Sequence, residues 1–263
     1  MAEATAIEWT NSTWNPSTGC ERVSPGCDHC YALRFSERFR GINGHYFEHG
    51  FDVQLRANML GKPEAWKKPR FVFVNSMSDL FHRAIPDSYI ARVFEVMERI
   101  DRHVYQVLTK RPERMVRFIH ERYGASRVPS HIWLGTSVEN NATGWRAAML
   151  AKINADVRFL SVEPMLGPID AVPLNGIAWV IVGGESGPKR RPIEEQWVRD
   201  VRDRCIENHV AFFFKQWHKA RTGRLLDERT WDEMPVSRPG LAAPREIERA
   251  RSAATGGRLG MAV

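Results

Sequence analysis

Three of the four cysteines in the chain lie within eleven residues, as Cys20, Cys27 and Cys30 with the spacing C-x6-C-x2-C. Glycine and proline residues among them predict a turn-rich loop, which can wrap thiolates around a compact metal centre. A structural zinc site closes with four ligands, whereas an iron–sulfur cluster held by three cysteines leaves one iron open to a further ligand. The pattern therefore favours an iron–sulfur cluster. Zinc is the alternative if His29 or His45 supplies a fourth ligand.

The rest of the sequence is typical of a protein in a reducing compartment. The N-terminus lacks the basic start and the apolar run of a signal peptide, and no apolar stretch approaches the length of a membrane span. We therefore predict a cytoplasmic protein without membrane contact, in which clustered cysteines bind metal more often than they pair. Cys205 lies on the inward stripe of a predicted helix, so we expect it to be a small core residue.

The chain of 263 residues carries an excess of positive charge, with 38 Lys and Arg against 31 Asp and Glu, a net charge of +7. Such an excess permits a polyanionic partner, so a nucleic acid or a nucleotide is a candidate substrate. Nine tryptophans are a high count, and we expect most of them in the core or in the walls of a pocket.

Short apolar runs alternate with amphipathic segments from residue 71 onward. The runs are continuously apolar, as in strands of a parallel sheet that are buried on both faces. Alternation of such strands with helices favours a partial or full parallel β/α barrel of the TIM type. We predict a further strand at Ile7–Thr10, with the cysteine loop following this first strand. The six apolar runs are 71–74, 104–108, 132–134, 157–160, 179–182 and 211–214.

Helices are expected between these strands, at 87–100, from Pro112 onward, and around 145–153 and 197–205. In the third of them, Trp145, Ala148, Met149 and Ile153 are predicted to face the core. We expect a single barrel domain over residues 1–237, an irregular insert at about 41–69 with a short strand at 53–55, and a disordered tail at 238–263.

Each apolar run ends in polar or small residues rather than in a plain turn. In a parallel barrel these carboxyl ends open onto one face, and active sites lie on that face. A cysteine loop after the first strand would lie on the same rim. Glycines there let a ligand approach the backbone closely, while carboxylates and hydroxyls can bind ribose hydroxyls or an ammonium group. The candidate cofactor-binding residues are Ser76, Ser78, Asp79, Thr136, Ser137, Glu163, Gly183, Gly184 and Glu185.

Five segments carry a resemblance to a known family. Over about residues 5–235 the chain resembles an uncharacterised, often phage-encoded protein family, whose three-cysteine motif is itself similar to that of radical S-adenosylmethionine (SAM) enzymes. The segments are Trp14-Asn15-Pro16 through Cys30-Tyr31-Ala32, Asn75-Ser76-Met77-Ser78-Asp79-Leu80-Phe81, Leu108-Thr109-Lys110-Arg111-Pro112, Ser161-Val162-Glu163-Pro164 and Gly183-Gly184-Glu185-Ser186.

The resemblance to radical SAM enzymes implies a [4Fe–4S] cluster on the three cysteines, with SAM bound through its open iron and a reductant protein as electron donor. Two features depart from that pattern. Radical SAM enzymes usually space the cysteines C-x3-C-x2-C, and they usually carry a Gly-Gly-Glu-like stretch after the second strand. Here Asn75–Asp79 occupies that place, and the Gly-Gly-Glu of Gly183–Glu185 follows a much later strand.

Three functional hypotheses follow. The first is a radical SAM-like enzyme that cleaves SAM reductively and abstracts hydrogen from a substrate. In such an enzyme the cofactor generates the radical, and the protein binds and orients the reactants. The second is a nucleic-acid-binding module whose cysteines hold structural zinc. The third is a divalent-metal hydrolase with Asp79, Glu163 and Glu185 as oxygen ligands.

Overall fold

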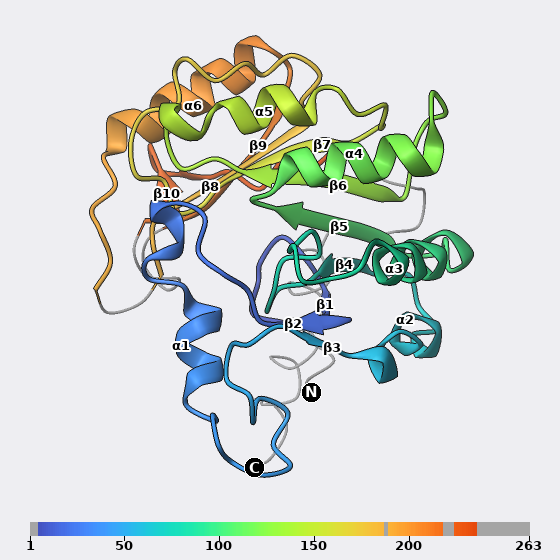
Figure 1. Ribbon diagram of the computed structural model, residues 1–263. Helices are drawn as coiled ribbons and strands as arrows, with labels where there is room; N and C mark the ends of the chain where they lie inside the picture. The colour runs from blue at the N-terminus through green and yellow to red at the C-terminus, as the bar shows by residue number, and fades with distance from the viewer. Residues whose placement is uncertain (1–4, 187–188, 218–223, 236–263) are drawn as a thin grey trace, which may run out of the picture.

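The computed structural model describes residues 5–186, 189–217 and 224–235. Its centre is a sheet of seven parallel strands, whose order in the sheet is the same as their order in the chain (Figure 1). All six apolar runs from residue 71 onward are confirmed as strands of this sheet. The strands are β1 (Ser12–Trp14), β4 (Phe71–Val74), β5 (Val104–Thr109), β6 (Ile132–Ser137), β7 (Arg158–Val162), β8 (Trp179–Gly183) and β9 (Ala211–Gln216).

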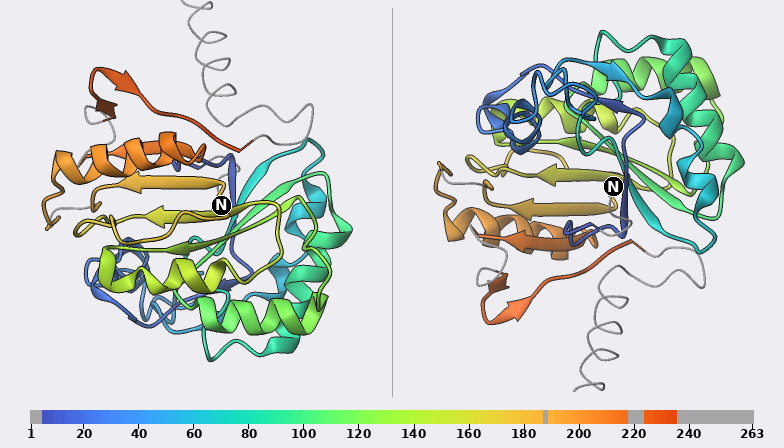
Figure 2. Two further views of the ribbon diagram at one scale, coloured as in Figure 1. Left: turned by 90° about the horizontal axis from the view of Figure 1, so that it is seen from above. Right: turned by 90° about the horizontal axis from the view of Figure 1, so that it is seen from below.

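Sequential strand order explains the shape of the sheet. Each connection moves to the next strand in the same direction, and right-handed crossovers then place every helix on the same face. The sheet curls away from these helices into a half-barrel, with β1 and β9 as its two edges (Figure 2). The fold is thus a partial barrel. The helices on the convex side are α3 (Asp87–Arg99), α4 (Pro112–Tyr123), α5 (Trp145–Leu150) and α6 (Glu195–Glu207).

The sheet has a hydrophobic core on each face, which explains why its strands read as continuous apolar runs. Alternate side chains of a strand point to opposite faces. In β4, Val72 and Val74 pack under the helices, whereas Phe71 and Phe73 fill the concave side. The concave core is aromatic, and Trp133 and Trp179 meet in it edge to face with ring centroids 5.9 Å apart.

The strand predicted at Ile7–Thr10 is wrong, because the first strand is β1 at Ser12–Trp14. The preceding segment is a turn that inserts its apolar side chains into the half-barrel. Trp9 contacts Phe73 and Trp179, with ring centroids 4.7 and 6.1 Å away, and so links strands on both sides of the curve. Its burial comes from filling this interior and not from pairing with a neighbouring strand.

Replacing Trp9 with alanine should therefore destabilise the fold strongly. Truncation of a fully buried aromatic side chain costs about 3–5 kcal/mol in the free energy of unfolding. Trp145→Ala is the matched control: that side chain is 46% exposed, so its loss should cost less than about 1 kcal/mol. Urea denaturation of both variants checks this, and equal losses would contradict a structural role for the N-terminal turn.

The inward stripe predicted over 145–153 is wrong in part. Ile153 is buried as predicted and Met149 is half-buried, but Trp145 and Ala148 are exposed. Their places in the core are taken by Arg146, Ala147 and Leu150. A buried guanidinium reverses the expected pattern because Arg146 has a buried partner, the Glu139 carboxylate, at 3.1 Å. The helix thus buries one half of an ion pair in place of its tryptophan, which its pattern of apolar residues does not indicate.

The insert at 41–69 contains short elements. The strand predicted at 53–55 is found as β3 (Gln54–Leu55), which pairs with β2 (Ser17–Thr18) in antiparallel orientation. The predicted tail at 238–263 lies outside the described residues. No helix in the described part of the chain is long and apolar enough to cross a membrane. The remaining elements are β2 (Ser17–Thr18), η1 (Pro25–Cys27), α1 (Tyr31–Glu37), β3 (Gln54–Leu55), η2 (Ala57–Met59), α2 (Lys62–Ala65), η3 (Asn141–Thr143), β10 (Leu225–Leu226) and β11 (Arg229–Thr230).

Candidate functional site

The carboxyl ends of the strands and the cysteine loop open into one cavity of about 550 Å³. Parallel register brings the strand ends to a common edge, as the pairs Thr109↔Thr136 and Ser137↔Ser161 show. Cys20, Cys27 and Cys30 line this cavity together with residues from the ends of all strands from β4 to β9. The two predictions, a cysteine loop and a polar rim, thus concern the same place in the fold.

Of the nine predicted cofactor-binding residues, six line the cavity and three do not. Strand alternation explains the difference for Thr136, which points to the convex face and donates a hydrogen bond to the Thr109 carbonyl. The alternation also places Gly184 on that face. A Cβ on Gly184 would lie 1.6 Å from the carbonyl oxygen of Trp217, so close backbone packing requires a glycine here. The cavity-lining six are Ser76, Ser78, Asp79, Ser137, Glu163 and Glu185.

Cys20 contacts an ion pair from the rim. The Arg111 guanidinium donates to the Asp79 carboxylate at 3.0 Å and to the Cys20 sulfur at 3.4 Å. Asp79 also accepts hydrogen bonds from the Thr109 hydroxyl and the Lys110 amide. Burial raises the pKa of Cys20 to about 11, and the Asp79 carboxylate adds to this rise while Arg111 opposes it. A metal that binds here must displace the thiol proton.

Glu139, at the end of β6, holds the middle of the cysteine loop. Its buried carboxylate accepts a hydrogen bond from the Ser24 hydroxyl at 2.8 Å and pairs with Lys110 at 3.3 Å and Arg146 at 3.1 Å. Burial raises the pKa of Glu139, but the two cations outweigh it, so the pKa lies below its usual value. A Cβ on Gly26 would lie 2.5 Å from this carboxylate, so a glycine lets the loop approach it.

Glu185 ends the Gly-Gly-Glu stretch and follows β8. It contacts the same cysteine loop from a position two strands away from Glu139. Its carboxylate is 2.8 Å from the His29 ring and pairs with the Arg191 guanidinium at 2.5 Å. Arg191 also donates to the Pro25 carbonyl at 2.9 Å. Burial alone would raise the pKa of Glu185, but the hydrogen bonds from Arg191 and His29 lower it to about 2. The glutamate is therefore a carboxylate that contacts the loop between Cys27 and Cys30.

The three cysteine sulfurs are free of disulfides and are partly exposed in the cavity. Cys27 and Cys30 are joined by a tight turn, in which the Cys30 amide donates to the Cys27 carbonyl at 3.3 Å. Among the described residues, no three His, Cys, Asp or Glu side chains are grouped around a point where one metal ion would bind. In an iron–sulfur cluster each cysteine binds a different iron, so its sulfurs do not need to converge on one ion.

The comparison with protein families gives one match. A model described as "Protein of unknown function (DUF5131)" matches residues 4–235, nearly all of the described chain. The chain belongs to this family. No curated protein and no solved structure matches it.

The site of this DUF5131 protein includes residues that were not predicted from the sequence. Ser24 and Arg191 do not line the cavity but hold the cysteine loop from behind. Ser24 lies within the cysteine segment, and Arg191 belongs to no apolar run or motif. Trp9 and Phe73 give the cavity an apolar wall. Strand alternation separates Phe73 from the valines on either side of it in β4, but because all of these residues are apolar, the sequence does not indicate which of them face the cavity.

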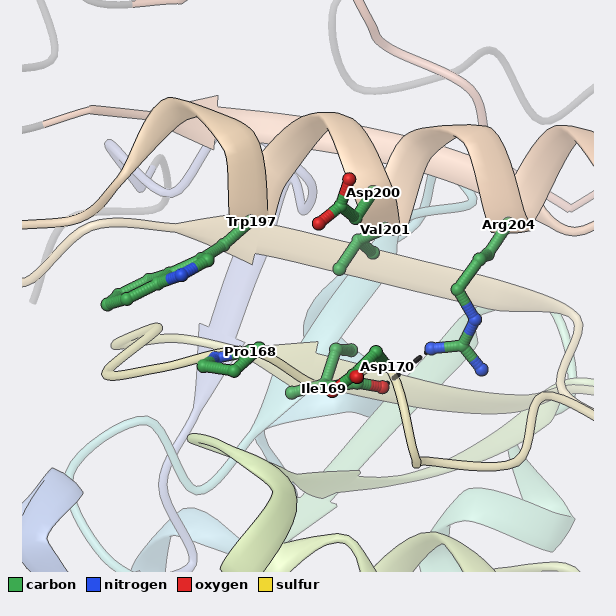
Figure 3. Close-up of a pocket in the computed structure, with 7 residues that line it drawn as sticks. All are labelled: Pro168, Ile169, Asp170, Trp197, Asp200, Val201 and Arg204. Atoms are coloured by element: carbon green, nitrogen blue, oxygen red, sulfur yellow. Dashed lines mark hydrogen bonds between the residues drawn. The ribbon is translucent and has the colours of Figure 1, made fainter.

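A second cavity in the DUF5131 fold lies away from the cysteines, between α6 and the loop after β7 (Figure 3). Arg204 bridges it with a hydrogen bond to the Ile169 carbonyl at 2.6 Å, and Trp197 borders it. Its volume of about 10 Å³ holds at most one water molecule, so it cannot accept a substrate.

Proposed function

We propose that this protein is a radical SAM-like iron–sulfur enzyme. The observation that carries the proposal is that a loop with three free cysteines opens into the same 550 Å³ cavity as the carboxyl ends of the barrel strands. Active sites of β/α barrels lie on this face. When bound, a [4Fe–4S] cluster with an open iron would supply an electron for reductive cleavage of SAM and so generate the radical that abstracts hydrogen from a substrate.

In this proposal Cys20, Cys27 and Cys30 hold the cluster, and the rim positions the loop that carries them. Arg111 donates to the Cys20 sulfur and would offset negative charge on a thiolate there. Glu139 fixes the loop between Cys20 and Cys27. Rigid support of this kind orients the ligands of a metal centre.

Polar residues after β4 are proposed to contact SAM, because this segment follows the strand that neighbours β1. Ser76 and Ser78 line the cavity there and are partly exposed. Tyr31, directly after Cys30, donates its hydroxyl to the Ser76 carbonyl at 2.5 Å, which ties this segment to the cysteine loop. The apolar wall of Trp9 and Phe73 would exclude water from a reactive intermediate.

The three carboxylates at the strand ends do not fit a divalent-metal hydrolase as well as the three cysteines fit an iron–sulfur cluster. Asp79 pairs with Arg111, Glu163 with Lys215 and Glu185 with Arg191. Each acid thus already has a cationic partner, and each partner would have to be displaced before the acids could share a metal ion. This supports the cysteine-based centre over an oxygen-ligand site.

The proposal is tested by anaerobic reconstitution of the full chain with iron and sulfide. We expect a brown protein with about four iron atoms per chain, which binds SAM and releases 5′-deoxyadenosine when a chemical reductant is added. A colourless protein that instead retains zinc would support a structural zinc site. An iron-loaded protein that does not bind SAM would retain the cluster but overturn the enzyme proposal.

A further inference from the structure

Most charged side chains that line the cavity are committed to the cysteine loop or to its supports. Glu185 contacts His29, and Lys110 pairs with Glu139. The ion pair of Glu163 and Lys215 differs, because among the described residues its charged groups have hydrogen bonds or ion pairs only with each other. Its side chains are 19% and 17% exposed, and they line the cavity.

The pair meets across the end of β8. Strand alternation points Glu163, Gly183 and Lys215 to the concave side of three adjacent strands. A Cβ on Gly183 would lie 3.5 Å from both Glu163 and Lys215, at ordinary van der Waals distance, so the two side chains meet directly beside this glycine, across β8.

A break in strand register occurs at Lys215. Val182 pairs with Phe214 but the next residue, Gly183, pairs with Gln216, so Lys215 is the extra residue of a bulge in β9. Bulges commonly re-aim a side chain next to a binding site. The bulge, the glycine and the ion pair thus lie together at the β9 edge of the half-barrel, which is the edge opposite β1.

The pair offers a specific combination of hydrogen-bonding groups. Lys215 has three N–H donors, of which Glu163 takes one, and the second carboxylate oxygen of Glu163 remains an acceptor. Because the pair has no net charge, it favours a neutral group with a donor and an acceptor side by side. Trp9 and Phe73 in the wall of the same cavity suit the flat apolar faces of such a group.

We propose that Glu163 and Lys215 bind the hydrogen-bonding edge of a substrate nucleobase. A nucleobase combines flat faces with an edge that carries an adjacent donor and acceptor. This proposal rests on the proposed function, because it takes the cavity to be the substrate site. If Glu163 and Lys215 bind a base, the substrate is a nucleotide or a nucleic acid, and its base lies opposite the cysteine loop.

The test is a calorimetric titration of the full-length protein with cytidine, guanosine and uridine, which needs neither iron nor reductant. We expect at least one nucleoside to bind. Glu163→Gln and Lys215→Met should each weaken it roughly ten- to a hundredfold, the loss of one charge-assisted hydrogen bond. Arg127→Gln, which breaks the exposed Arg127–Asp156 pair, is the matched control and should leave binding unchanged.

A parallel titration of the cluster-loaded protein with S-adenosylhomocysteine separates substrate from cofactor. We expect its affinity to stay within about twofold in both variants. An equal loss for S-adenosylhomocysteine would show that the pair holds the cofactor and would overturn the proposal. It is likewise overturned if no nucleoside binds the wild type, or if the variants bind it as the wild type does. Loss of iron binding alone would overturn only the proposed function.

A charge-swapped double variant, Glu163→Lys with Lys215→Glu, distinguishes a loss of binding contacts from a loss of folding. It keeps an ion pair at Gly183 but exchanges the positions of donor and acceptor. We expect it to melt within a few degrees of the wild type and to bind the nucleoside at least about tenfold more weakly. If this variant binds the nucleoside with wild-type affinity, Glu163 and Lys215 do not bind the hydrogen-bonding edge of the base.

Discussion

Replacing any one of Cys20, Cys27 and Cys30 with alanine is expected to abolish iron binding after anaerobic reconstitution. A cluster held by three cysteines has no other protein ligand, so the loss of one thiolate leaves it with only two. The iron content should fall from about four atoms per chain to less than about one. Iron analysis and the visible absorption of the cluster measure this directly.

Cys205→Ala is the matched control. Cys205 is buried on α6, under the convex face of the sheet, and does not line the cavity. Its replacement should keep the full iron content and cost about 1 kcal/mol of stability, as expected for loss of a small buried group. Iron retained in all three single variants of the loop cysteines would exclude them as cluster ligands.

Removal of the Glu139 carboxylate is expected to give the largest loss of stability among the rim residues. Glu139 is buried and has Lys110, Arg146 and Ser24 as partners. Glu139→Ala leaves two cations without their anion in a buried environment, which costs about 3–5 kcal/mol. Because Ser24 also loses its partner, the loop between Cys20 and Cys27 should loosen, and the variant should lose bound iron faster than wild type under a chelator.

Two comparisons separate these effects. Asp156→Ala breaks an ion pair with the exposed Arg127 and should cost no more than about 1 kcal/mol. Ser24→Ala keeps the Glu139–Arg146 pair but cuts its link to the loop. It should leave stability nearly unchanged and still speed the loss of iron. An iron release rate equal to wild type in Ser24→Ala would show that Glu139 stabilises the fold without positioning the loop.

The apolar runs predicted the strands well because both faces of the sheet are buried, so most residues of each run are apolar. Gln106 in β5 is the buried polar exception, and its amide donates to the Trp9 carbonyl. The run at Phe71–Val74 became β4 with the predicted bounds. The same reasoning failed at Ile7–Thr10, where Ile7 and Trp9 are apolar for a different reason, since they fill the open side of the half-barrel. A short apolar segment does not reveal whether it pairs with a strand or packs inside the curve.

The alternation of strands and helices, and the polar residues that follow the strands, could both be predicted from the sequence. These features depend on local pattern and on the common direction of parallel strands. Which rim residues face the cavity was decided by the tertiary structure. Glu185 contacts His29 across 156 positions of sequence, and Lys215 pairs with Glu163 across β8, at a bulge in β9. Such pairings depend on strand curvature, register and loop path, which arise only when distant segments pack together.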